Sequence, residues 1–234
     1  MFIFPLIAAI ISVACFATVA FDYVRRPKPD NLIWSIAFAL FAYAVLSEII
    51  GGTLGWTGFL ARSYFISGAI LVVGYLALGE LFLIARRPVA WSALVLLGIL
   101  SVISIVAVAQ APVTGDLGTE GWRALERSGL LLFLAIFVNT IGTLILVVGA
   151  LWSAYRFRRL QTMRNRMLGC IAIAIGTLTT ASGGVLTRLG REEFLYISMA
   201  VGIAMIYWGY LIARTPARAV SVPVHASRVG SLGK

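Results

Sequence analysis

Long apolar stretches separated by short polar or basic links make up most of this 234-residue chain. A helix needs about 20 apolar residues to cross the hydrocarbon core of a bilayer. Seven stretches approach or exceed that length: 2–24, 31–52, 59–85, 89–109, 130–155, 167–187 and 194–213. Lipid offers the backbone no hydrogen-bond partners, and the alternation typical of barrel strands is absent. The pattern therefore predicts an all-α, polytopic membrane protein with seven transmembrane helices.

Composition supports this prediction and changes how the charge is interpreted. The chain is 61% hydrophobic and 12% charged, whereas soluble domains carry about 25% charged residues. Its net charge of +10 lies mainly in the links: with the N-terminus outside, 14 of the 19 Lys and Arg residues are on the inner side. The charge thus predicts N-terminus out, C-terminus in, and attraction to anionic lipid head groups rather than to nucleic acid. We expect a multi-pass protein of the cell (inner) membrane.

Residues 51–88 and 183–216 resemble each other. Each has a Gly-Gly pair, a polar link, a long apolar stretch and an Ala-Arg-x-Pro end. This predicts one seven-helix domain, 1–216, with a parallel 3+1+3 repeat, although chance similarity in a glycine-rich chain is the alternative. The expected parts are repeat A (2–88), a linker helix (89–109), an outer loop (110–129) and repeat B (130–216). Residues 217–234 are expected to form a disordered basic cytoplasmic tail.

Helices two and three carry E-x-x-G-G, G-W and an Arg-x-Tyr pair before G-A-I-L-x-V-G. These motifs resemble small bacterial seven-helix integral membrane proteins of uncharacterised function, over nearly the whole chain. The 3+1+3 plan alone resembles the PQ-loop and sugar-exporter transporters and the microbial rhodopsins, although no Pro-Gln pair occurs here. Such a likeness is architectural and implies no functional residue.

The sequence lacks the residues that several kinds of membrane-protein chemistry require. A retinal Schiff base needs a lysine within the last helix, but the lysines are Lys28 and Lys234. The single histidine, His225, is in the tail, which excludes bis-histidine haem and histidine-based hydrolysis. We therefore expect no cofactor and no metal, and enzymatic activity is not favoured.

Glu48, in the outer half of the second helix, is the main candidate for a binding residue, because ionisable groups within a span are costly. If helices two, five and six face one another, polar side chains could line a site around it: Tyr43, Ser47, Asn139, Thr143, Thr177 and Thr180. The alternative is that the hydroxyls bond to their own helices and that Glu48 pairs with Arg62 or Arg188 at the outer rim.

Glu80, in the inner half of the third helix, is the second carboxylate within a span. Arg86 and Arg87 follow it, and Arg87 at i+7 is expected on the same face; Arg25 or Arg26 at the neighbouring helix end is the other expected partner. We expect either a structural ion pair or a gating role. The outer loop 110–129 contains Trp122 and Leu125, which predicts a short interfacial helix or, alternatively, a solvated connector.

Three functions remain open. A small-solute carrier with a site near Glu48 would need a water-accessible cavity reaching that residue. Such a cavity would not be needed by a ligand-binding sensor acting through a partner or by an accessory subunit of a membrane complex. The partners expected are the lipid bilayer and either further copies of this chain or another membrane protein.

Overall fold

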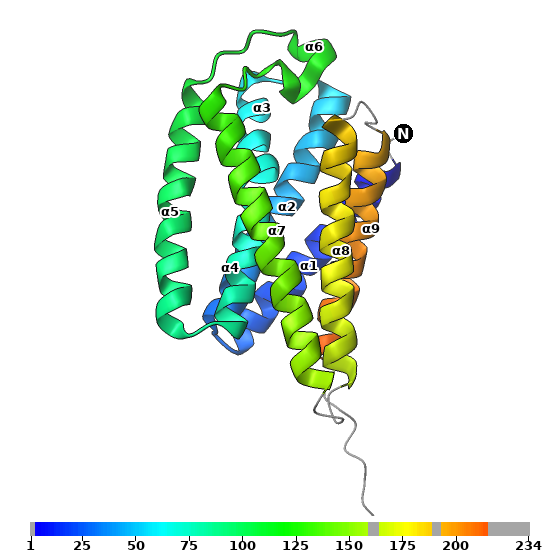
Figure 1. Cartoon of the computed structure of the whole chain (residues 1–234). Coiled ribbons are helices and arrows are strands. Elements are labelled where there is room, and N and C mark those ends of the chain that lie inside the picture. The colour runs from blue at the N-terminus through cyan, green and yellow to red at the C-terminus, as the bar shows by residue number, and fades with distance from the viewer. Residues whose placement is uncertain (1–2, 159–163, 189–192, 215–234) are drawn as a thin grey trace, which may run out of the picture.

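The computed structural model describes residues 3–158, 164–188 and 193–214, and nearly all of these residues are helical (Figure 1). Six segments are long and apolar enough to span a membrane: Phe4–Arg25, Pro29–Leu54, Gly58–Ile84, Arg87–Gln110, Gly129–Arg156 and Tyr196–Ala213. Met167–Gly183 is a shorter apolar helix. The prediction of an all-helical fold is confirmed for the described residues, and six of the seven expected spans correspond to helices long and apolar enough to cross a membrane. The sidedness and the repeat stay predictions, and residues 217–234 lie outside the described residues.

The long helices are α1 (Ile3–Arg25), α2 (Pro29–Leu54), α5 (Arg87–Gln110), α7 (Gly129–Arg158), α8 (Arg164–Arg188) and α9 (Glu193–Arg214). Proline opens α2 and stands in the first turn of α5, where its missing N–H removes no helical hydrogen bond. Gly55, with φ of +94°, ends α2, a conformation that favours glycine. The Thr57 side chain then caps the next helix by accepting from the Leu60 amide.

The α-helical geometry of the third span is interrupted by a π-helical segment. The span consists of α3 (Gly58–Tyr64), the π-helical segment η1 (Phe65–Leu71) and α4 (Val72–Ile84). A π-helix widens the turn and often marks a functional position. The Asn139 amide of α7 donates to the Ala69 carbonyl within η1 at 2.7 Å, and Gly68 packs against Ala44 of α2. The irregular segment is thus held by two neighbouring helices.

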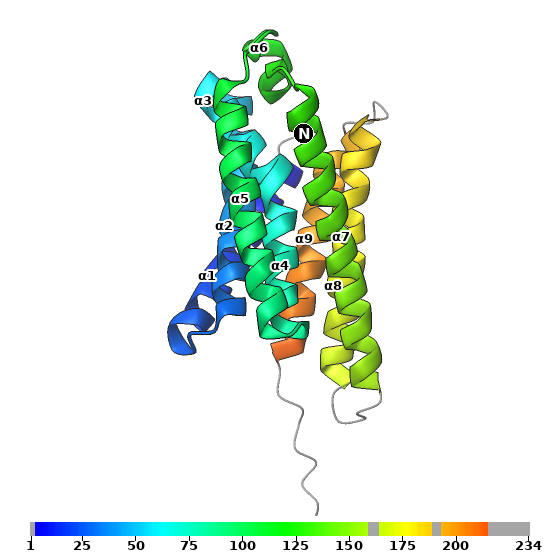
Figure 2. The same ribbon diagram turned by 60° about the vertical axis from the view of Figure 1, so that its left-hand side comes forward.

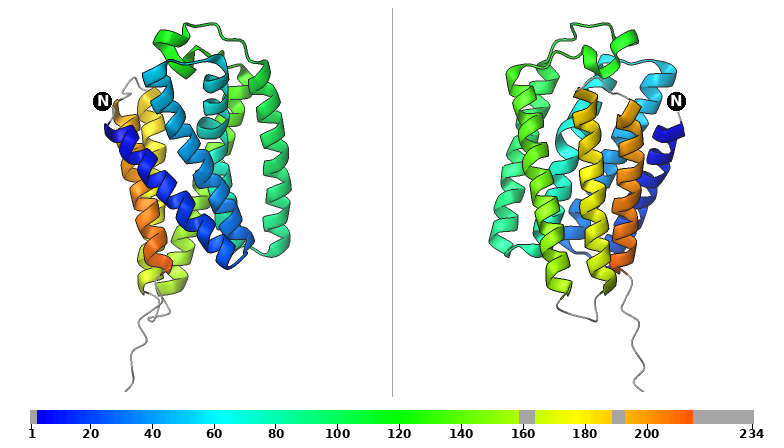
Figure 3. Two further views of the ribbon diagram at one scale, coloured as in Figure 1. Left: turned by 180° about the vertical axis from the view of Figure 1, so that it is seen from behind. Right: turned by 45° about the vertical axis from the view of Figure 1, so that its right-hand side comes forward.

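The spans form a bundle with two ends (Figures 1 and 2). The loop between α5 and α7 covers one end, which we call the cap end. The α1–α2 and α4–α5 turns lie at the other end, the turn end. Figure 3 shows α1 running obliquely across the bundle, and it contacts both α2 and α9. Glu48 is therefore near the cap end and Glu80 near the turn end, because α2 and α4 run in opposite directions.

Helices α8 and α9 pack closely along their length, and the right-hand view of Figure 3 shows them side by side. Glycines spaced by seven residues face each other: Gly169 opposite Gly209, and Gly176 opposite Gly202. A Cβ at Gly169 would stand 2.5 Å from the Gly209 carbonyl oxygen, so only glycine permits this approach. Small residues serve this role in membrane bundles because they allow backbone-to-backbone packing.

Candidate functional site

The Glu48 carboxylate joins three parts of the chain that are distant in sequence. Oε1 accepts a hydrogen bond from Trp122 Nε1 at 3.1 Å, and Oε2 accepts from the Tyr196 hydroxyl at 3.4 Å. Glu48 belongs to α2, Trp122 to the covering loop and Tyr196 to α9. A partly buried carboxylate thereby connects the loop to two spanning helices through directional contacts.

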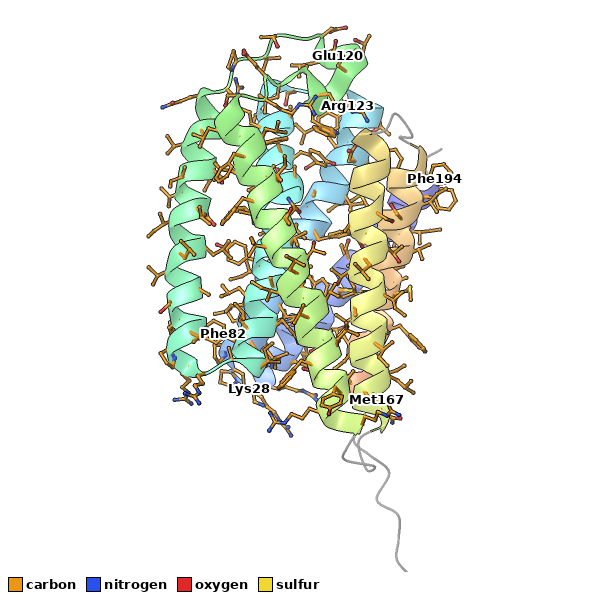
Figure 4. All side chains as sticks on the ribbon, in the orientation of Figure 1. Lys28, Phe82, Glu120, Arg123, Met167 and Phe194 are labelled. Atoms are coloured by element: carbon orange, nitrogen blue, oxygen red, sulfur yellow. The ribbon has the colours of Figure 1, made fainter. Side chains whose placement is uncertain are left out.

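The covering loop is a folded element, which we call the cap segment (residues 112–128). It contains α6 (Leu117–Glu120) and the 3-10 helix η2 (Gly121–Ala124). Its two arms pair through the Glu126 amide and the Pro112 carbonyl at 2.9 Å, and through Thr114 and Ala124 at 3.0 Å. Figure 4 shows Glu120 and Arg123 on this segment at the cap end. The loop thus contains two short helical turns, and its expected position at the membrane interface stays a prediction.

Asp116 begins α6 and stabilises its first turn. Its carboxylate accepts from the Gly118 amide at 3.0 Å and from the Thr119 hydroxyl at 3.1 Å. The Gly118 hydrogen bond, followed by that of Thr119, holds the pKa of this exposed carboxyl below its usual range, because both favour the charged form. The cap segment therefore has its own local structure apart from its contact with Glu48.

Aromatic side chains fix the cap segment on the bundle. The Trp122 ring lies 5.3 Å from Tyr64 and 6.2 Å from Phe65, measured between ring centroids, and Trp56 meets Tyr64 edge-on at 5.6 Å. Gly121, with φ of +61°, allows the segment to approach Trp56, since a Cβ there would lie 2.8 Å from the indole nitrogen. These rings pack against one another between the cap segment and the start of the third span, and Trp122 also reaches Glu48.

Arg62 and Arg123 both lie at this end, with different roles. The Arg123 guanidinium is 5.5 Å from the centroid of the Trp122 ring and adds positive charge near the Glu48 carboxylate. Arg62 Nη2 instead donates to the Ala111 carbonyl at 2.9 Å, which anchors the start of the cap segment. Arg62 is therefore not the recorded partner of Glu48, and the Arg188 side chain lies outside the described residues.

A small cavity lies beside Glu48. It is lined by Pro5 and Ala8 of α1, Val45 and Glu48 of α2, and Tyr196 and Met199 of α9. Its volume of about 10 Å³ is close to the minimum that admits a single water molecule. The conformation described here is therefore closed around Glu48, and this cavity has no room for a solute.

The predicted hydroxyl residues bond mainly to their own helices. Ser47 donates to Tyr43 O, Thr177 to Ile173 O and Thr180 to Gly176 O, at 2.8 to 3.0 Å. The Tyr43 side chain is 40% exposed, and its hydroxyl donates to Ser63. These contacts correspond to the alternative interpretation in the sequence analysis, in which the hydroxyls satisfy helical carbonyls.

Within the described residues, Asn139 and Thr143 of α7 form no hydrogen bond to Glu48. The Asn139 amide donates to Ala135 O within its own helix and to Ala69 O across to η1, both at 2.7 Å. Asn139 thus stabilises the π-helical segment. Of the predicted set, the structure places Ser47 next to Glu48 along α2 and distributes the other polar side chains elsewhere.

Glu80 is 5% exposed and faces α7. A Cβ at Gly149 would lie 2.8 Å from Glu80 Cγ, so the side chain rests against the backbone of α7. Within the described residues its carboxylate has no recorded hydrogen bond or ion pair. The expected shared face with Arg87 is wrong: Ala85 leaves the helix with ψ of 163° and Arg87 begins α5. Arg86 and Arg87 are both exposed.

A second group near Glu80 also lacks a partner. The Trp34 indole of α2 packs on Gly79, and its buried Nε1 donates to no acceptor in the described part of the chain. Trp34 stacks on Tyr210 of α9 with ring centroids 6.3 Å apart, and the Tyr210 hydroxyl donates to Asp22 at 2.6 Å. The turn-end half thus contains buried polar groups, but they are not joined into one network around the carboxylate.

The sequence analysis missed Trp122 and Tyr196 as partners of Glu48. The position of Trp122 in a twenty-residue outer loop was the available signal, since an aromatic residue amid polar neighbours often packs back onto the protein. Tyr196 is near the start of the last helix, and neither its spacing nor its neighbours in the sequence point to Glu48.

Comparison with known proteins does not identify a family. No family model matches the chain, and neither a curated protein nor a solved structure matches it. Inference about function therefore rests on the geometry of the described residues.

Proposed function

We propose that this multi-pass membrane protein is a carrier for a small organic cation, with Glu48 as the anionic group of its binding site and the cap segment as the gate. The observation that carries the proposal is the carboxylate that bonds at once to the cap segment and to α9. A solute that replaces either donor would change how these parts are held together. Such coupling of a site to a closure element is what a carrier needs.

The chemistry around Glu48 favours a cationic solute. A carboxylate attracts ammonium groups, and Trp122, which bonds to Glu48, already has the Arg123 guanidinium 5.5 Å from its ring centroid, within the range of a cation–π contact. Arg123 stands near the same carboxylate and would have to move aside or be outcompeted. An amine therefore suits this site better than an anion or a neutral sugar.

The closed cavity gives the mechanism its first step. About 10 Å³ beside Glu48 admits no amine, so the Trp122 or Tyr196 hydrogen bond must open before solute binds. Opening at the cap end exposes the carboxylate, and the solute then supplies the donors that these side chains withdraw. The carboxylate, once paired with the bound amine, would then favour closure of the cap segment over the occupied site.

Uptake by proteoliposomes tests the proposal. A panel of small amines, with organic anions and sugars for comparison, should give amine-selective accumulation that Glu48→Gln abolishes. Glu120→Gln is the matched control, because Glu120 is an exposed acid of the cap segment. The carrier proposal fails if no amine accumulates, or if Glu48→Gln and Glu120→Gln transport equally well.

A ligand-binding sensor is the second candidate, and the smallness of the cavity favours it. A protein that signals needs a conformational change at the cap end but no path through the bundle. An amine that raises the melting temperature of the wild-type protein, but not of Glu48→Gln, without any uptake would support the sensor over the carrier.

The topology and family are further proposals. We infer a cytoplasmic C-terminus and an inner-membrane location from the bias of basic links, and a parallel repeat from residues 51–88 and 183–216. The motifs 48–52 and 68–74 support membership among small bacterial seven-helix proteins. Reporter fusions at the C-terminus test the orientation: a reporter active only outside the cytoplasm should remain silent there.

A further inference from the structure

A purely apolar groove separates α5 from its neighbours. It lies between α4, α5 and α7 and has a volume of about 120 Å³. Its walls are formed only by Gly, Ala, Val, Leu, Ile and Phe, among them Leu81, Ala93, Leu97, Val138 and Ile145. Apolar cavities of about 150 Å³ stay dry and accept hydrocarbon guests in other proteins. This groove is therefore suited to a hydrocarbon segment and unsuited to a polar solute.

The groove borders the surface that faces lipid. Figure 1 shows α5 at the edge of the bundle, and its outward face exposes large apolar side chains such as Val95, Ile99 and Val102. Since α5 crosses a membrane by length and composition, hydrocarbon chains are the surrounding medium. The occupant most readily available to the groove is an acyl chain.

Positive charge lies at the turn end of the same groove. Arg86 and Arg87 are exposed in the turn that joins α4 to α5. Arg87 precedes Ala93 of the groove wall by six residues, which is about 9 Å along a helix. A phospholipid with its phosphate at these arginines can therefore place an acyl chain alongside Ala93.

An aromatic side chain at this position also suits a head group. Trp91 packs edge-on against Phe82 with ring centroids 5.6 Å apart and is 54% exposed, as expected of an aromatic side chain at a membrane interface. Figure 4 shows Phe82 at this end of the bundle.

We propose that the groove between α4, α5 and α7 binds an anionic phospholipid, with one acyl chain in the groove and the phosphate against Arg86 and Arg87. The proposal is independent of the function assigned to Glu48. It goes beyond general attraction of basic links to lipid, because it requires both a chain in one groove and a head group at one turn.

Native mass spectrometry of the full chain, released from detergent, provides the test. Phosphatidylglycerol and phosphatidylcholine with identical acyl chains are added in turn. We expect at least one phosphatidylglycerol to remain bound and phosphatidylcholine to bind several-fold less. Arg86→Gln with Arg87→Gln should weaken phosphatidylglycerol binding by about fivefold for each arginine, the effect of one basic residue at an anionic surface.

Matched variants separate the two parts of the site. Ala93→Phe should fill the groove and weaken both lipids, whereas Val95→Phe adds the same ring to the exposed face of α5 and should not. Arg156→Gln with Arg158→Gln removes equal charge from the exposed end of α7 and should leave binding unchanged. Ala93→Leu serves if the phenylalanine variant fails to fold.

Four outcomes would overturn the proposal. One is equal retention of the two lipids, and another is equal loss in the Arg156 and Arg86 double variants. The third is unchanged phosphatidylglycerol binding in both folded Ala93 variants, which would place the chain elsewhere. Displacement by millimolar inorganic phosphate would identify an anion site at the turn and would likewise reject a lipid site.

Discussion

Glu48 and Glu80 are both carboxylates within helices long and apolar enough to span a membrane, but the protein surrounds them differently. Glu48 receives directional hydrogen bonds from Trp122 and Tyr196, which belong to separate elements. Glu80 is more deeply buried, has no recorded polar partner among the described residues and rests on the glycine backbone of α7. The first is positioned by donors and the second by packing. Burial alone therefore does not indicate which carboxylate holds parts of the fold together.

Replacing each carboxylate by leucine gives the largest expected contrast. Glu48→Leu leaves the Trp122 and Tyr196 donors without an acceptor and should lower the free energy of unfolding by about 2–4 kcal/mol, because each unpaired buried donor costs about 1–3 kcal/mol. Glu80→Leu removes a polar group without breaking a recorded bond and should leave stability unchanged or raise it. Thermal unfolding in detergent measures both. Equal destabilisation by the two variants would contradict the comparison.

Replacing Gly149 by a larger residue tests whether packing against α7 positions the Glu80 side chain. Gly149→Leu pushes a side chain against Glu80 Cγ and Ile84 and should destabilise by about 1–3 kcal/mol, as overpacking does. Gly98→Leu is the control, because a Cβ at Gly98 meets nothing within 4 Å. Adding Glu80→Ala to Gly149→Leu should recover part of the loss. No recovery in the double variant would mean that the side chain of Glu80 does not fill this space.

A double-mutant cycle measures the bond between the cap segment and α2. Trp122→Phe and Glu48→Leu should be coupled by about 0.5–1.5 kcal/mol, the usual net value of a hydrogen bond. Trp122→Phe should also speed amide hydrogen exchange in residues 112–128. Trp91→Phe with Glu48→Leu provides the uncoupled control, since Trp91 is at the turn end of α5. Additive effects in both cycles would show that the cap segment is held by its aromatic contacts alone.

The smallest effect concerns the cap segment's own turn. The pKa of Asp116 is lowered in the folded protein, so the stability that it contributes is complete above the ordinary aspartate pKa of about 3.9 and is lost as the pH falls through the lower folded value. We expect faster exchange of the Gly118 amide, relative to its intrinsic rate, only in that acidic range. In Asp116→Asn this acid step should vanish. A wild-type change near neutral pH would point to another group.

The sequence was informative where one physical rule dominates. Hydropathy identified the helical spans, and the cost of charge in lipid singled out Glu48 and Glu80. The partners of Glu48 depend on how a loop docks, and neither periodicity nor charge spacing contains that information. Arg87 was placed on the wrong element because Ala85 breaks the helix just before it. The hydroxyls of Thr177 and Thr180 bond locally, so their shared polarity did not imply a shared site.

The π-helical segment at Phe65–Leu71 also determines the rotational phase of everything that follows it in the third span. Each residue of an α-helix turns the chain by about 100°, so the extra residue in a widened turn rotates α4 by that amount relative to α3. Deleting one residue from 65–71 would restore a uniform helix, yet it would turn Glu80 away from Gly149 while leaving Tyr64 beneath Trp122. The orientations of α3 and α4 about the axis of this span are therefore set independently. A change of one residue in the length of the π-helical segment alters the orientation of α4 without disturbing that of α3.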